Sequence, residues 1–86
     1  MIRVRCMGHI GTSVGKDILE FPGDEMRTSE LIEILREMAR NDPALGFTKY
    51  NTLVVVNSGD AFTGATRDRI LRDGDEVVLL PFSHGG

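Results

Sequence analysis

The sequence predicts an α+β domain in which a mixed sheet of four to five strands is covered on one face by one main helix. Three observations support this fold class. An alternating strand pattern opens the chain, a strongly amphipathic helix lies in its first half, and two β-branched apolar runs lie in its second half. The chain has 86 residues, which is enough for one compact domain and too few for two.

The composition is that of a globular chain without affinity for polyanions. Ten basic and thirteen acidic residues give a net charge of -3, which argues against a nucleic-acid partner or a membrane surface. The longest apolar run, residues 77–82, is too short to span a bilayer. Cys6 is the only cysteine, so no disulfide can form within the chain. We therefore expect a cytoplasmic protein.

The first part of the chain predicts a hairpin. In residues 2–6 three apolar side chains alternate with two arginines, which indicates a strand with one buried and one wet face. Three glycines in residues 8–15 predict a turn region. Residues 16–21 predict a second strand, antiparallel to the first across this long loop, and Pro-Gly-Asp at residues 22–24 ends it.

The clearest predicted element is an amphipathic helix. Thr28 or Ser29 can cap its N-terminus, and glutamates in the first turn suit the positive end of the helix dipole. Asn-Asp-Pro at residues 41–43 ends it. Its apolar residues recur at i, i+3, i+4 and i+7 and predict the face that packs on the sheet: Leu31, Ile34, Leu35 and Met38.

Two more strands complete the predicted sheet. Residues 53–56, a leucine and three valines, predict a short strand that turns at residues 57–60. The last strand, residues 76–80, follows a tight Asp-Gly-Asp turn at residues 73–75. Further core candidates lie between these two strands: Phe62, Ile70 and Leu71.

Two short motifs suggest chemistry, but a structural role explains them better. Residues 11–17 resemble a phosphate-binding loop, yet the spacing is one residue short, Asp17 replaces the magnesium-binding Ser or Thr, and no helix is predicted to follow. Cys6 and His9 have a C-x-x-H spacing, but zinc needs more ligands, so we expect Cys6 to be a buried small hydrophobe. No catalytic pair stands out, and we predict neither a metal site nor a free-standing enzyme.

The segment after the last strand carries the functional signal. Residues 81–86 read Pro-Phe-Ser-His-Gly-Gly and follow the strand without a linker. Glycine has no Cβ, so Gly85 and Gly86 can thread a channel too narrow for any side chain, where an enzyme can activate the carboxylate of Gly86. A frayed glycine end is the alternative. His84 is either a spacer or a group that titrates near neutral pH.

The order of elements, the Asp-Gly-Asp-Glu-Val run at residues 73–77 and the tail resemble the β-grasp sulfur carriers. These are the small subunit of molybdopterin synthase, the thiamine sulfur carrier and the ubiquitin-related modifier that serves tRNA thiolation. The His-Gly-Gly ending is most similar to the ubiquitin-related modifier. The length is more similar to the molybdopterin synthase subunit, but Phe82 departs from the pattern of that subunit. The resemblance implies a ubiquitin-like β-grasp domain at residues 1–81 and a flexible tail at residues 82–86.

The resemblance also implies a carrier protein rather than an enzyme. An activating enzyme would use ATP and magnesium to adenylate Gly86, and a sulfur source would convert it to a thiocarboxylate for molybdopterin synthesis or tRNA thiolation. The implied partners are this activating enzyme and the molybdopterin synthase large subunit or a tRNA thiolation enzyme. Target-protein lysines are the partners if the chain is instead a protein modifier. A β-grasp interaction domain with incidental glycines is the third possibility.

The last strand also predicts a partner surface. Because successive side chains alternate, counting back from the end of the chain by analogy with ubiquitin places Val77 and Leu79 inward. Their neighbours then point outward beside the tail, and these are the expected partner-binding residues: Val78, Leu80, Phe82 and His84. A loop at residues 47–51 that covers them is the alternative. Arg3 and Arg5 are expected nearby on the same face.

Overall fold

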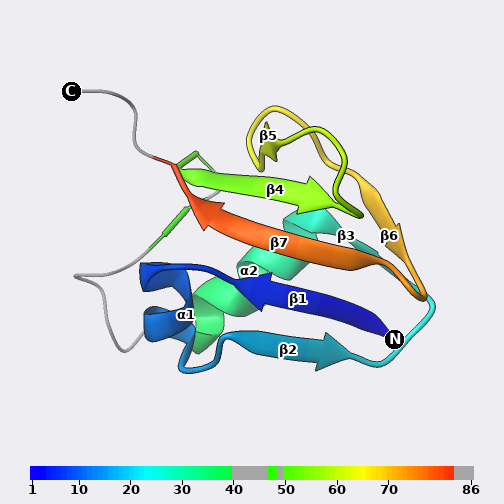
Figure 1. The fold of residues 1–86 in the computed structure, drawn as a ribbon, viewed down its shortest axis with the longest axis horizontal. Coiled ribbons are helices and arrows are strands. Elements are labelled where there is room, and N and C mark those ends of the chain that lie inside the picture. Colours follow the sequence, from blue (N-terminus) through cyan, green and yellow to red (C-terminus); the bar gives the residue numbers. More distant parts are fainter. Residues whose placement is uncertain (40–46, 49, 83–86) are drawn as a thin grey trace.

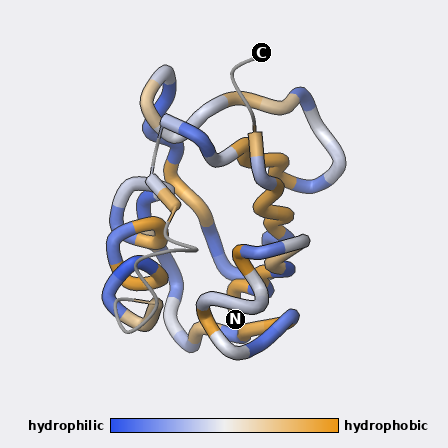
Figure 2. The backbone as a smooth tube through the Cα atoms, turned by 90° about the vertical axis from the view of Figure 1, so that its left-hand side faces the viewer, coloured by the Kyte–Doolittle hydropathy of each residue, from blue (hydrophilic) through white to orange (hydrophobic). Residues whose placement is uncertain are grey.

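The computed structural model describes residues 1–39, 47–48 and 50–82, and its elements form two layers (Figure 1). In chain order the described elements are β1 (Ile2–Cys6), α1 (His9–Val14), β2 (Ile18–Phe21), β3 (Glu25–Arg27), α2 (Thr28–Met38), β4 (Thr52–Val56), β5 (Phe62–Thr63), β6 (Ile70–Arg72) and β7 (Glu76–Pro81). Apolar and polar stretches alternate along the chain in Figure 2, as expected for elements with one buried and one wet face.

The larger sheet is mixed because its first and last strands lie side by side. Its order is β2-β1-β7-β4-β5, and α2 crosses the face that lies behind it in Figure 1. The β1–β7 pair is parallel, and the other neighbouring pairs are antiparallel. A separate antiparallel pair joins β3 and β6. The structure confirms the predicted fold class: a mixed sheet with one main helix across one face.

The core lies between this sheet and α2. Alternate residues of β1, β4 and β7 are buried, as the patterns of their sequences predict. Val77 and Leu79 are fully buried, which confirms their predicted inward direction. Phe62 and Leu71 are also buried, as expected, while Ile70 is only half-buried.

The buried face of α2 differs from the predicted stripe. Leu31 and Leu35 are buried as expected, but Ile34 is 38% exposed and Met38 is 42% exposed. Ile32 is buried instead. Two overlapping apolar stripes are possible in this sequence, and packing against the sheet selects the one that also buries Thr28 and Ala39. The predicted stop at residues 41–43 lies outside the described residues.

The predicted long loop after β1 contains the short helix α1, so the loop assignment was wrong. Ile10 and Val14, one helical turn apart, are buried. Gly11 lies between them, where an added Cβ would be 2.8 Å from the Cys6 carbonyl oxygen and 2.7 Å from an Asp17 carboxylate oxygen. Glycine weakens a helix locally, so here tertiary packing outweighs local propensity. The predicted antiparallel pairing of β1 and β2 across this segment is confirmed.

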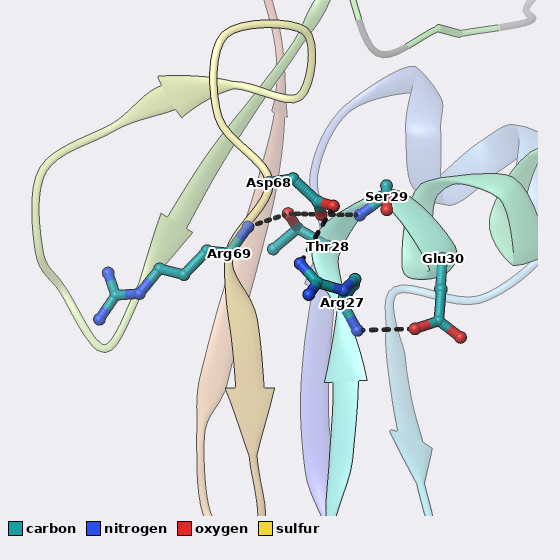
Figure 3. A network of polar contacts seen from close by, with 6 residues as sticks. All are labelled: Arg27, Thr28, Ser29, Glu30, Asp68 and Arg69. Atoms are coloured by element: carbon teal, nitrogen blue, oxygen red, sulfur yellow. Dashed lines mark hydrogen bonds and ion pairs between the residues drawn. The ribbon is translucent and has the colours of Figure 1, made fainter.

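The N-terminus of α2 is capped by a residue distant in sequence (Figure 3). Thr28 and Ser29, the predicted caps, lie inside the helix, and Arg27 is the N-cap residue. Asp68 Oδ1 accepts hydrogen bonds from the Ser29 backbone N–H at 3.1 Å and from Thr28 Oγ1 at 3.3 Å. Thr28 Oγ1 in turn accepts from the Arg69 backbone N–H at 3.0 Å. These bonds fasten the segment before β6 to the helix.

The predicted turns after β4 and before β7 are confirmed; both lie at the same end of the β4–β7 ladder, and Asn57 links them. Asn57 takes a positive φ of 51° after β4, and its side chain donates to Asp75 Oδ1 at 2.9 Å. Its Oδ1 accepts from the Glu76 backbone N–H at 2.8 Å. Gly74 has a φ of 92°, as a tight turn before β7 requires. This linkage fixes the register of β7 at the end opposite the tail.

Candidate functional site: the outer face of the sheet

The face of the sheet opposite α2 carries an aliphatic patch. On β7 two aliphatic residues point away from the core, and two residues of β4 lie directly opposite them. The cross-strand neighbours are Val78 with Val55 and Leu80 with Leu53. All four are half-buried, so part of each side chain meets solvent. We call these four residues the outer patch.

Charged side chains border the outer patch along β1. Arg5 lies beside Val78 in the parallel β1–β7 pairing. Beyond β1, Ile18 lies opposite Arg5, and Glu20 lies opposite Arg3. The Arg3 guanidinium and the Glu20 carboxylate approach to 3.9 Å. The expectation that both arginines share the outer face with Val78 is confirmed, and they separate the patch from the edge strand β2.

The loop before β4 leaves the outer patch partly open. Phe47, the residue best suited to cover apolar surface, belongs to the buried core. Thr48 and Asn51 instead form a hydrogen bond with each other: Asn51 Oδ1 accepts from the Thr48 backbone N–H at 2.7 Å. The described part of this loop therefore does not bury Val78 or Leu80, against the alternative that it would.

The chain leaves the sheet beside the outer patch. The Phe82 backbone N–H donates to the Asn51 carbonyl at 2.7 Å, which extends the β4–β7 pairing beyond Pro81. On the other side of β7, Gly8 packs so closely that an added Cβ would lie 3.0 Å from Pro81 Cγ. The backbone is therefore held on two sides up to Phe82.

The site residues predicted from the sequence fall into two groups. Val78, Leu80 and Phe82 are half-buried and follow one another along β7 and just beyond it. The other three carry the predicted chemistry and lie outside the described residues: His84, Gly85 and Gly86. The predicted boundary between domain and tail, at residues 81 and 82, stays a prediction.

Cys6 is confirmed as a buried small residue. Burial, and then the negative charge of Asp17, raise the pKa of the Cys6 thiol to about 11. A thiol with so high a pKa is almost entirely protonated at neutral pH and is a poor nucleophile. Cys6 therefore packs the core as a small apolar residue.

Within residues 1–39, 47–48 and 50–82, no three histidine, cysteine or acidic side chains gather closely enough to hold a metal ion. In the same part of the chain, no helix is both long and apolar enough to cross a membrane.

The sequence did not reveal which residues outside β7 join the outer patch. Leu53 and Val55 belong to a predicted strand, but the face on which they lie depends on the register of that strand against β7. A register shift of one residue exchanges the two faces of a strand. The Asn57 linkage and the Phe82 hydrogen bond fix that register, and both join segments far apart in sequence.

The topology and the exit of the chain from β7 define a ubiquitin-like β-grasp domain. The fold is similar to that in the crystal structure of SAMP1 from Haloferax volcanii. The TM-score is 0.59, and the match covers 99% of this chain and 98% of that chain at 18% sequence identity. No known protein family and no curated protein matches the sequence. The likeness shows that the whole chain shares the fold of SAMP1.

Proposed function

We propose that this protein is a ubiquitin-like sulfur carrier, a substrate of an activating enzyme rather than a catalyst. The observation that carries the proposal is the partly exposed outer patch, which continues along β7 to Phe82; in the sequence, Gly-Gly follows at residues 85–86. A partner that docks on the patch would lie beside Pro81 and Phe82, whose backbone positions are held by Gly8 and Asn51. The fold shared with SAMP1 supports this reading.

The proposed chemistry takes place at the carboxylate of Gly86. The carboxylate attacks the α-phosphorus of ATP, pyrophosphate leaves, and an acyl-adenylate forms. In this proposal the activating enzyme uses ATP and magnesium, and this chain binds neither on its own. A sulfide nucleophile then attacks the acyl carbon, and AMP leaves to give the thiocarboxylate. The sulfur goes on to a cofactor precursor in molybdopterin synthesis or to a tRNA base.

The mass of the intact protein, isolated from its own cells without reducing agents or thiols, tests this proposal. We expect Gly86 to be the last residue and a fraction to carry one sulfur in place of one oxygen there. A variant with one residue appended after Gly86 is the control and should remain unmodified. Conjugates through Gly86 to lysine would replace the carrier proposal with the modifier. Unmodified protein after incubation with ATP and the candidate activating enzyme would overturn both.

A matched pair of substitutions tests the docking step. Leu80→Asp places a charge in the outer patch, and Ile34→Asp places the same charge on an exposed aliphatic residue of α2, on the other side of the molecule. We expect Leu80→Asp to raise the KM for the carrier in ATP–pyrophosphate exchange, with Ile34→Asp near wild type. Equal effects of the two variants, or an unfolded Leu80→Asp, would contradict the proposed surface.

A further inference from the structure

The backbone of the edge strand β2 has hydrogen-bonding groups on its free side. Along β1 the Arg3 and Met7 N–H groups donate toward β7, at 3.1 Å and 2.9 Å. The Cys6 N–H donates in the opposite direction, to the Asp17 carbonyl at 2.7 Å. Residues of β1 therefore alternate between β7 and β2 as hydrogen-bonding partners.

The antiparallel register carries this alternation into β2. Leu19 and Phe21 lie opposite Val4 and Ile2, the positions of β1 whose backbone groups face β2. Ile18 and Glu20 therefore direct both their N–H and C=O groups away from β1. In the described part of the chain β2 has one neighbouring strand, so these four groups form an open edge.

This edge is less protected against further pairing than the opposite edge of the sheet, and its one charged side chain is Glu20. The opposite edge of the sheet, β5, has only the two residues Phe62–Thr63, which is too short to template another strand. The four residues of β2 include neither proline nor lysine, and Pro22 follows only where the strand ends. A longer open edge of this kind favours the addition of an extended chain.

The side chains of β2 indicate the chemistry of that chain. Ile18 is 44% exposed on the outer face. The Glu20 side chain is 49% exposed, and Arg3 at 3.9 Å is too distant for a hydrogen bond. Leu19 and Phe21, on the α2 side, are half-buried against the core. A strand with an aliphatic residue opposite Ile18 and a basic residue opposite Glu20 matches this edge.

We propose that the free edge of β2 binds an extended segment of a partner polypeptide as an additional antiparallel strand. In its own direction the segment reads basic, apolar, aliphatic, opposite Glu20, Leu19 and Ile18 respectively. The backbone groups of Ile18 and Glu20 supply the hydrogen bonds, and the Glu20 carboxylate selects for positive charge. The binding does not require Gly86, so it stands or falls separately from the sulfur-carrier proposal.

A synthetic peptide, acetyl-Thr-Val-Lys-Val-Ile-Thr-amide, tests the proposal by amide hydrogen exchange. Saturating peptide should slow exchange at Ile18 and Glu20 by about tenfold or more, with Leu19 and Phe21 unchanged because they are already paired. A control peptide methylated on the lysine and isoleucine backbone nitrogens should not bind. No slowing at millimolar peptide, or equal binding of the methylated peptide, would overturn the proposal.

A charge exchange tests the selectivity. Glu20→Lys should weaken binding of the lysine peptide and strengthen binding of its glutamate counterpart, each by about two- to fivefold. Thermal unfolding should show that the variant remains folded. If both peptides bind both proteins equally, the Glu20 carboxylate has no part in recognition and the stated partner chemistry is wrong.

Discussion

The two faces of β7 carry similar aliphatic side chains in different surroundings. Val77 and Leu79 are enclosed between the sheet and α2 and are fully buried. Val78 and Leu80 alternate with them, lie beside their neighbours on β4 and β1, and are only half-buried. One strand therefore stabilises the fold through one face and leaves partly exposed aliphatic side chains on the other. Substitutions one residue apart should distinguish the two faces.

The adjacent leucines of β7 give the most direct test. Leu79→Ala should lower the free energy of unfolding by about 2–5 kcal/mol, because it removes buried contacts and leaves a cavity. Leu80→Ala removes a half-buried side chain and should cost only about 1 kcal/mol. Urea denaturation of both variants measures the difference. Equal losses would show that the two faces of β7, one packed against α2 and one facing outward, do not differ as described.

The reactivity of Cys6 measures how well solvent is excluded from the inner face, which is the face of the sheet that packs against α2. Because the pKa of its thiol rises from 9.0 to about 11, the thiolate fraction at pH 8 should be about 100-fold lower than in the unfolded chain. Labelling by a disulfide reagent should be slowed at least this strongly until denaturant is added. Fast labelling of the folded protein would indicate that this face opens readily.

The same thiol makes stability depend on alkaline pH. The folded pKa is raised, so the stabilisation is complete below 9.0 and is lost as pH rises toward about 11. Cys6→Ala should remove this part of the pH dependence while keeping the small apolar residue. Parallel alkaline slopes for the two proteins would assign the loss to other groups.

The Asp68 cap tests how firmly α2 is held over the inner face. The pKa of Asp68 lies below its usual value of 3.8, and the main cause is the hydrogen bond that its carboxylate accepts from the Ser29 backbone N–H. Its stabilising effect is therefore present above pH 3.8 and is lost as pH falls through the lower folded value. Asp68→Asn should lower Tm at pH 7 and approach wild type in strong acid. Asp60→Asn, at an exposed turn position, is the control and should leave Tm unchanged at both pH values.

The sequence predicted the parts of this molecule that local pattern controls. Alternation in residues 2–6 and the apolar run in residues 77–80 identified β1 and β7, and counting back by analogy with ubiquitin gave the inward direction of Leu79. The tight turn around Gly74 was also predictable, because few other residues adopt its backbone conformation. These features depend on neighbours in sequence.

Features set by distant contacts could not be predicted. The cap on α2 comes from Asp68, and the helical form of α1 depends on Gly11 packing against Cys6 and Asp17. The buried side of α2 includes Ile32 rather than Ile34 because of the sheet beneath it. The outer patch likewise depended on the register of β4 against β7. In each case the local sequence allows more than one solution, and tertiary packing selects one.

The Arg3–Glu20 pair should contribute least to stability. Both side chains are about half exposed, and their charged atoms are 3.9 Å apart, so solvent and salt screen the attraction. A double-mutant cycle with Arg3→Gln and Glu20→Gln should give a coupling free energy of about 0–0.5 kcal/mol.

A coupling well above this would mean that the Glu20 carboxylate is already neutralised by Arg3. A partner's basic residue would then have to displace Arg3, and the lysine peptide should bind more tightly to Arg3→Gln than to wild type. A weak coupling leaves the carboxylate at the β2 edge available for recognition.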